Sequence, residues 1–239
     1  MILFEDKVKF NKDAFLKKLQ EISASLQVQP DWIMAVMNSE TGGTFNPQIV
    51  NKQKAITPGY DGDGKRVKPA GVADSANDFE RSKYRATGLI QFMPKTAKSL
   101  GTSTQALYKM TNAQQLDYVY KYFLPAKGKM KSFEDVYLYT FYPLAVGKPE
   151  DYIIGSERGL DYAKKLVQQN PLDLNHDGHL TIGEFREFIY KKIPKDFLSQ
   201  LKKKQLRQLK KIKELLQEGF CYWHWVVSFM QNVNRLWSF

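Results

Sequence analysis

A mainly α-helical fold is predicted by the spacing of the apolar residues. They recur at intervals of three and four through most of the chain, as in helices that bury one face. No segment alternates apolar and polar residues for long enough to predict a strand. Hydrophobic residues make up 43% of the 239 positions, which suffices for a packed core. We therefore expect one helical domain of good size with an appended region.

Two helices are predicted near the N-terminus. The first covers residues 12–24, and its apolar face carries Phe15, Leu16, Leu19 and Ile22. The second covers about residues 31–40, because Asp31 suits a helix start and Gly42-Gly43 a helix stop. Its apolar stripe ends in a carboxylate, since Ile33, Val36, Met37 and Glu40 lie at i, i+3, i+4 and i+7.

Glu40 is the residue whose position most clearly suggests a chemical role. Burial and the partial negative charge of a helix C-terminus both disfavour an ionised carboxylate, so we expect the pKa of Glu40 to be raised. A carboxylic acid that stays protonated near neutral pH can donate a proton to a leaving group. The alternative is a partly exposed glutamate that only ends a helix.

The middle of the chain combines a long loop with further helices. Residues 46–84 are rich in Pro, Gly, Asn, Asp and Lys and predict a loop, a feature that often forms a lid or a binding segment. Within this loop, residues 61–64 (Asp-Gly-Asp-Gly) predict a turn rather than a metal site. Helical spacing returns at Pro94 and ends near Gly101, and Thr111 to Gln114 form a capping box that opens another helix. A last helix is predicted over Phe133–Phe141 and is interrupted at Pro143.

Three short motifs stand out along these elements. The first is Ser-Glu-Thr-Gly-Gly-Thr-Phe-Asn-Pro at 39–47, the second Ala-Thr-Gly-Leu-Ile-Gln-Phe-Met-Pro at 86–94, and the third Phe-Tyr-Pro-Leu-Ala-Val-Gly at 141–147. In this order they resemble the lysozyme-like soluble lytic transglycosylases, which cleave the glycan strands of peptidoglycan. The resemblance covers about residues 25–150 and implies a lysozyme-like helical domain.

The resemblance also implies roles for individual residues. Glu40 would be the general acid and base, and Tyr142 would hydrogen-bond and orient its carboxyl group. The sugar cleft would be lined by Gly88, Leu89 and Gln91.

The chain departs from the family pattern at three points. Thr41 stands where the family has Ser, which keeps a hydroxyl near the acid, and the resemblance places Thr41 and Tyr139 among the substrate-binding residues. Pro143 stands where the family has Asn, and this makes Tyr139 the alternative partner of the Glu40 carboxyl. The segment between the first two motifs is also longer than the family pattern leads us to expect.

Two reaction outcomes follow from this resemblance. A lytic transglycosylase is thought to need one carboxylate, because Glu40 would protonate the glycosidic oxygen and the 6-hydroxyl of muramic acid would close a 1,6-anhydro ring. Ordinary glycosidases use two carboxylates instead. A loop aspartate that approached Glu40 would make the enzyme a hydrolysing muramidase similar to goose-type lysozyme; the candidates are Asp61, Asp63, Asp74 and Asp78.

Residues 173–184 match the twelve-residue EF-hand loop and predict a structural calcium (Ca²⁺) site. Gly178 suits the sharp turn at position 6, and Leu180 is the apolar residue at position 8. Helices are predicted on both sides, over residues 160–169 and 184–190. No second loop of this kind is apparent, so we expect a structural clip rather than a sensor. The expected ligands are Asp173, Asn175, Asp177, the carbonyl of His179, Thr181 through a water, and Glu184.

The last part of the chain is basic and aromatic. From Lys191 to Phe239 it holds eleven Lys and Arg against three Asp and Glu, which is +8 of the formal +11. From Phe197 onward its apolar residues predict a long amphipathic helix. Such a tail suits packing on the main domain, docking to a partner protein or lying at a membrane interface. No nucleic-acid-binding motif accompanies it.

These observations predict three parts: a lysozyme-like domain at 1–160, an EF-hand at 161–192 and a helical tail at 193–239. One cysteine, Cys221, excludes an internal disulfide framework, and the sequence predicts no organic cofactor. Met1–Lys7 lack the features of a secretory signal peptide, so we expect delivery to the cell wall by a phage particle or another injection route. The expected function is a virion-associated peptidoglycan lytic transglycosylase. The alternatives are a hydrolytic muramidase and a non-catalytic structural or glycan-binding virion protein.

Overall fold

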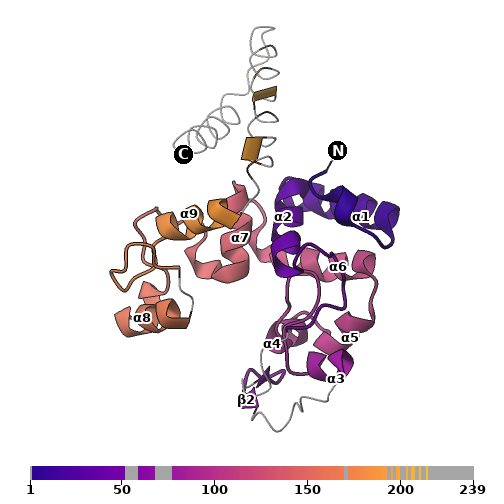
Figure 1. The fold of residues 1–239 in the computed structure, drawn as a ribbon, viewed down its shortest axis with the longest axis horizontal. Helices are drawn as coiled ribbons and strands as arrows, with labels where there is room; N and C mark the ends of the chain where they lie inside the picture. Colours follow the sequence, from indigo (N-terminus) through magenta and orange to yellow (C-terminus); the bar gives the residue numbers. More distant parts are fainter. Residues whose placement is uncertain are drawn as a thin grey trace. The chain divides into compact units, whose positions relative to one another are not determined.

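The computed structural model describes residues 2–51, 59–67, 77–169 and 172–192, with isolated residues between 195 and 214. The chain forms two compact units, Met1–Pro143 and Leu144–Phe239. The described residues are mainly helical, so the predicted fold class is confirmed (Figure 1). The division between the two units, after Pro143, falls earlier in the chain than the predicted boundary at residue 160.

The first unit begins with the two predicted helices. Helix α1 (Lys12–Leu26) ends where Gln27 takes a left-handed conformation, two residues beyond the predicted end. Helix α2 (Pro30–Glu40) starts at a proline, whose fixed φ and missing N–H suit the first helical position. The amide of Leu3 donates to the Asp31 carboxylate at 2.8 Å and so ties the N-terminal segment to the start of α2.

The region predicted as a loop contains ordered elements, which corrects that prediction. Strands β1 (Gly59–Tyr60) and β2 (Arg66–Val67) form a small antiparallel hairpin, and the predicted turn at 61–64 joins them. Helix α3 (Asp78–Ser82) follows, with an Asn77–Glu80 capping box at its start. Two-residue strands and a five-residue helix are too short to produce a recognisable period. In Figure 1 the hairpin lies below α4 (Pro94–Ser99), and Lys98 of that helix pairs with Asp63 of the hairpin turn.

Three further helices complete the first unit. Helix α5 (Thr104–Lys109) packs against α3. Helix α6 (Asn112–Phe123) opens with the predicted Thr111–Gln114 capping box, and α1 packs along it. Helix α7 (Phe133–Phe141) has the predicted bounds and packs against α2. A third capping box, Ser132 with Asp135, starts α7 and was not predicted.

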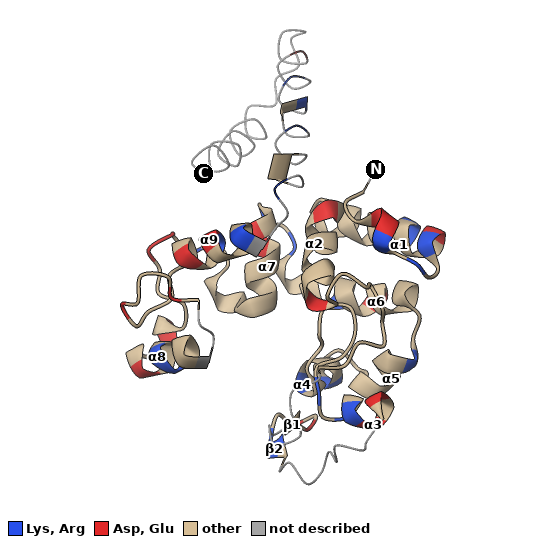
Figure 2. Cartoon of the chain, viewed as in Figure 1, with Lys and Arg blue, Asp and Glu red and all other residues tan. Residues whose placement is uncertain are grey.

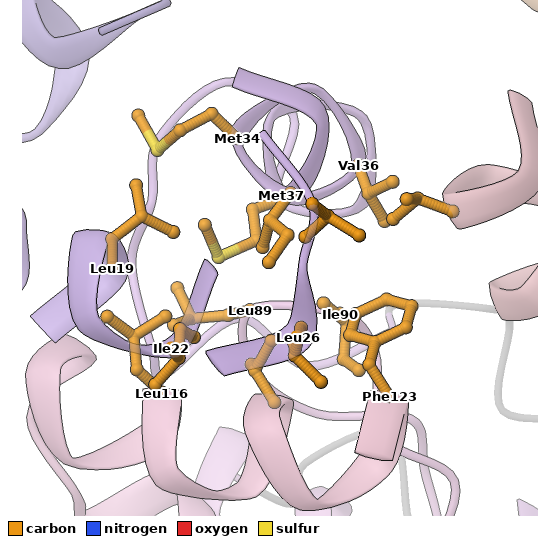
Figure 3. Close-up of a cluster of buried hydrophobic side chains, with 14 of the residues drawn as sticks. Leu19, Ile22, Leu26, Met34, Val36, Met37, Leu89, Ile90, Leu116 and Phe123 are labelled. Atoms are coloured by element: carbon orange, nitrogen blue, oxygen red, sulfur yellow. The ribbon is translucent and has the colours of Figure 1, made fainter. Parts of the chain in front are cut away.

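The core of this unit joins α1, α2 and α6 to the second sequence motif. Side chains of all four segments converge in Figure 3. Leu19, Met37, Leu89 and Leu116, one from each segment, are all 0% exposed. The core therefore fixes the second motif against the helix that carries Glu40.

The second unit contains α8 (Leu160–Gln169) and α9 (Ile182–Lys192), the two helices predicted to flank the EF-hand loop. Residues 150–154 run alongside residues 180–183, with backbone bonds from Ile154 to Leu180 (2.8 Å) and from Gly183 to Glu150 (2.9 Å). These bonds place the segment before α8 in the second unit, which explains the early division of the chain. Most of the predicted tail helix lies outside the described residues.

Candidate active site

Glu40 is the last residue of α2 and is half-buried. The helix ends there because Gly42 and Gly43 adopt positive φ angles of 59° and 79°. The amide of Gly43 then donates to the carbonyl oxygen of Asn38 at 2.7 Å and closes the end of the helix. A carboxylate at this position feels the partial negative charge of the last helical turn.

The side chain of Thr41 is buried and bonds to the backbone around it. It is only 2% exposed. Its hydroxyl donates to the Met37 carbonyl at 2.7 Å and accepts from the Phe45 amide at 3.1 Å. Phe45 is itself buried with a φ of 51°, a conformation that few residues other than glycine adopt. The Thr41 hydroxyl therefore holds the turn that follows Glu40, and its burial corrects the prediction that Thr41 binds substrate.

Two tyrosines that the sequence prediction missed lie close enough for the charge of Glu40 to influence them. Tyr137 of α7 shares a 2.6 Å hydrogen bond with Ser39, the residue before Glu40. Burial raises the pKa of Tyr137, the bond to Ser39 lowers it, and the negative charge of Glu40 raises it further. Burial likewise raises the pKa of Tyr122, with smaller contributions from Tyr139 and Glu40. Both tyrosines lie on helices whose spacing predicts burial, but spacing does not reveal a neighbour across the fold.

The two tyrosines named by the resemblance lie in and after α7. Tyr139 is partly buried, and its carbonyl oxygen accepts from the Tyr122 hydroxyl at 3.2 Å. Their rings meet edge to face, with centroids 5.4 Å apart. Tyr142 follows α7 and is buried, and its amide donates to the Leu138 carbonyl at 2.6 Å. Orientation of the Glu40 carboxyl by Tyr142, with Tyr139 as the alternative, stays a prediction.

The second motif forms a tight turn. Thr87 and Phe92 exchange backbone hydrogen bonds of 3.1 and 2.9 Å, so residues 88–91 close the turn between them. Val50 pairs with Thr87 on the other side, and the Gly88 amide donates to the Ile49 carbonyl at 2.8 Å. The segment after the first motif and the second motif are thus paired side by side.

The three residues predicted to line the sugar cleft have different surroundings. Gly88 is buried, with a φ of 86° that suits glycine. Leu89 is 0% exposed within the core, so its side chain cannot contact a sugar in this conformation. Gln91 is partly exposed, and its amide nitrogen donates to the carbonyls of Ile49 (3.3 Å) and Gly88 (3.1 Å). Of the three side chains, that of Gln91 is the one a ligand can reach.

The aspartates considered as a second carboxylate have local partners. Asp61 accepts from the amides of Asp63 (2.9 Å) and Lys65 (2.8 Å) and so shapes the hairpin turn. Asp63 forms an ion pair with Lys98 of α4, which lowers the pKa of Asp63. Asp78 pairs with Arg81 one helical turn later, at 3.3 Å. Asp74 lies outside the described residues.

The loop predicted to bind calcium is closed by its own hydrogen bonds. Glu184 accepts from the amides of Leu174 and Asn175 at 3.3 Å and from the Thr181 hydroxyl at 2.8 Å. Asp173 accepts from the Gly178 amide at 2.8 Å through one oxygen, while its other oxygen is buried and has no hydrogen-bond partner among the residues that the structure describes. Figure 2 shows the acidic residues along this loop. Within the part of the chain that the structure describes, no group of three or more His, Cys, Asp and Glu residues is arranged to hold a metal.

Comparison with protein families gives one match. Residues 18–117 match the family described as "Transglycosylase SLT domain". The matched segment includes Glu40 and the whole second motif but ends before Tyr139 and Tyr142. It supports the lytic transglycosylase family for this part of the chain, with peptidoglycan as the substrate class. No curated protein and no solved structure matches the chain.

Proposed function

We propose that this protein is a peptidoglycan lytic transglycosylase that cleaves the bond between N-acetylmuramic acid and N-acetylglucosamine, with Glu40 as its general acid and base. The main support is the family match over residues 18–117, which contains Glu40 at the end of α2. Glu40 protonates the glycosidic oxygen, and the 6-hydroxyl of the muramic residue attacks the anomeric carbon. Glu40 then takes the proton of that hydroxyl, so the 1,6-anhydro product forms without water.

The local contacts of the aspartates favour this route over hydrolysis. Asp61 and Asp63 are engaged in the hairpin turn and with Lys98, and Asp78 is engaged with Arg81. An aspartate that acted as a second carboxylate would first have to leave these partners. The hydrolytic muramidase is nevertheless the second candidate, because Asp74 is an additional acidic residue of the same segment.

Mass spectrometry of the products decides between the two routes. Digestion of purified peptidoglycan should release fragments that end in 1,6-anhydro-muramic acid. Fragments heavier by one water would mean hydrolysis and a second carboxylate. No soluble product from the intact chain would favour a non-catalytic structural or glycan-binding protein.

Replacing Glu40 tests its role directly. Glu40→Gln keeps the shape of the side chain but removes the transferable proton, so the rate should fall by about 10²–10⁴-fold, the usual contribution of general acid–base catalysis. Glu21→Gln on the exposed face of α1 is the matched control and should keep the wild-type rate. A Glu40→Gln variant that still clears cell walls would refute the assignment.

We further propose that residues 173–184 bind Ca²⁺ as a structural clip. The support is the EF-hand spacing, the buried oxygen of Asp173 and the hydrogen bonds that the Glu184 carboxylate accepts from the start of the loop. Calcium would neutralise these carboxylates and cross-link the segment before α9. The proposed ligands are Asp173, Asn175, Asp177, the His179 carbonyl, Thr181 through a water, and Glu184.

The basic tail is proposed to attach the enzyme to a virion protein or to an anionic membrane, so that it is delivered to the host cell wall. Its support is the charge of +8 between Lys191 and Phe239, together with the exposed positions of Lys203, Arg207 and Lys210. None of the described helices has the length and apolar character needed to cross a membrane. A chain that ends at Ile193 should lose association with particles or anionic vesicles but keep its activity on isolated peptidoglycan. Unchanged association would refute this role of the tail.

A further inference from the structure

One buried amide side chain joins three separate segments of the first unit. Gln115 of α6 is 0% exposed. Its amide nitrogen donates to the carbonyl oxygens of Pro47 at 2.8 Å and Leu107 at 2.7 Å. Its amide oxygen accepts from the Leu89 amide at 2.9 Å. The side chain thus pairs the buried Leu89 amide and the buried Pro47 carbonyl, and it gives the Leu107 carbonyl a second donor beside the Met110 amide.

Two of these segments belong to the motifs of the candidate site. Pro47 ends the motif that contains Glu40, and Leu89 lies in the second motif. Gly88 lies directly against the Gln115 amide, because a Cβ atom at Gly88 would come within 2.4 Å of the amide oxygen. A glycine at position 88 is therefore required both by its φ of 86° and by the approach of Gln115.

The same network extends to the side chain proposed to meet the sugar. The Gly88 amide donates to the Ile49 carbonyl at 2.8 Å, two residues after Pro47. Gln91 donates to the carbonyls of Ile49 and Gly88. A shift of either segment, residues 47–50 or residues 87–92, would therefore move the carbonyls that hold Gln91.

We propose that Gln115 is a positioning residue that sets the register between the segment after Glu40 and the turn carrying Gln91. It acts on substrate only through these backbone segments. An amide suits this task because it offers donors and an acceptor in one plane, whereas a carboxylate would face two carbonyl oxygens without a donor. The consequence for turnover rests on the proposed function, but the consequence for the turn does not.

The test compares Gln115→Met with Asn112→Leu. Asn112 is a matched control because it is also a buried amide of α6, at 1% exposure, but it donates to the Phe10 carbonyl at 2.7 Å, away from both motifs. Both variants lose buried hydrogen bonds and should lose stability. Only Gln115→Met should loosen the turn.

Hydrogen–deuterium exchange of residues 86–92 gives the readout that does not need activity. In the wild type, the Leu89 amide should exchange as slowly as core amides of α6. In Gln115→Met its exchange should rise at least tenfold, with little change in Asn112→Leu. Rapid exchange of Leu89 in the wild-type chain would overturn the proposal even if Gln115→Met fails to fold.

Kinetics on soluble glycan strands give the second readout, at a temperature where both variants are folded. Gln115→Met should lower kcat/KM by about 10- to 100-fold, the range expected for small displacements of substrate-positioning groups. Asn112→Leu should stay near the wild type. Equal kcat/KM for the two variants would overturn the positioning role. An inactive wild type with the expected exchange pattern would refute the proposed function but not the position of the turn.

Discussion

Replacing Leu89 with Ala tests whether the Leu89 side chain packs in the core or contacts the sugar. The resemblance implies that Leu89 lines the sugar cleft, but its side chain is 0% exposed and packs in the core with residues of α1, α2 and α6. Removing three carbon atoms forfeits about 2.4 kcal/mol, at about 0.8 kcal/mol for each buried methylene-sized group. A residual cavity adds to this loss, and measured costs of buried Leu→Ala changes reach about 2.7–5 kcal/mol.

The assay is thermal unfolding followed by kinetics. At about 3 kcal/mol, and about 3 °C for each kcal/mol in a chain of this length, Tm should fall by roughly 9 °C. KM for soluble glycan strands should match the wild type well below that temperature, because the side chain makes no contact with the sugar. Leu124→Ala is the control. Leu124 is 41% exposed, so its loss should change stability by no more than about 0.5 kcal/mol.

The opposite pattern would refute this reasoning. A Leu89→Ala variant with the wild-type Tm and a KM raised several-fold would mean that the side chain faces the substrate. The packing of the second motif described above would then be wrong, and the expectation from the resemblance would be right.

Three further changes test the surroundings of Glu40 and the calcium loop. Tyr137→Phe removes the 2.6 Å hydrogen bond to Ser39 and should lower the free energy of unfolding, measured with denaturant, by about 1 kcal/mol. Adding Ser39→Ala should lower it little further, because the same hydrogen bond is already lost. Losses that add in full would contradict the hydrogen bond. The pKa of Tyr122 is raised above its ordinary value of 10.0, so folding favours the neutral phenol. The free energy of unfolding should therefore fall as pH rises above 10.0, and Tyr122→Phe should reduce this slope; an unchanged slope would mean that other groups cause it. Asp177→Ala should abolish Ca²⁺ binding in calorimetry while Asp151→Ala, an exposed change outside the loop, keeps it; retained binding in Asp177→Ala would exclude the loop as the site.

The helices could be predicted well because their signals are local. The apolar spacing and the glycine pair give the end of α2 at Glu40, and the capping box gives the start of α6. The hairpin of β1 and β2 could not be predicted in this way. Its strands have two residues each and depend on contacts with distant groups, such as the pairing of Asp63 with Lys98.

For the candidate site, too, local sequence patterns predict only part of what the structure shows. A motif indicates which residues matter, but it does not distinguish a side chain that meets the ligand from one that holds the backbone. Leu89 and Thr41 are both buried, and Gln91 is the accessible member of its turn. The sequence did not reveal Gln115, because its three partners are contributed by segments up to 68 positions away. Such a role follows from the fold rather than from any local pattern.

The electrostatic surroundings of Glu40 bear on the choice between one and two carboxylates. Burial is the main cause of the raised pKa of two phenols, Tyr122 and Tyr137, and a negative charge on Glu40 adds to it, so both phenols lie within electrostatic reach of Glu40. A second carboxylate brought into such a place would have to give up its own hydration, and it would repel Glu40 whenever Glu40 is ionised. Asp63, by contrast, gains from its lysine partner, which lowers the pKa of its carboxyl. Moving a loop aspartate towards Glu40 therefore costs free energy at both ends. Attack by a neutral hydroxyl of the substrate carries no such cost, so these surroundings favour the anhydro product.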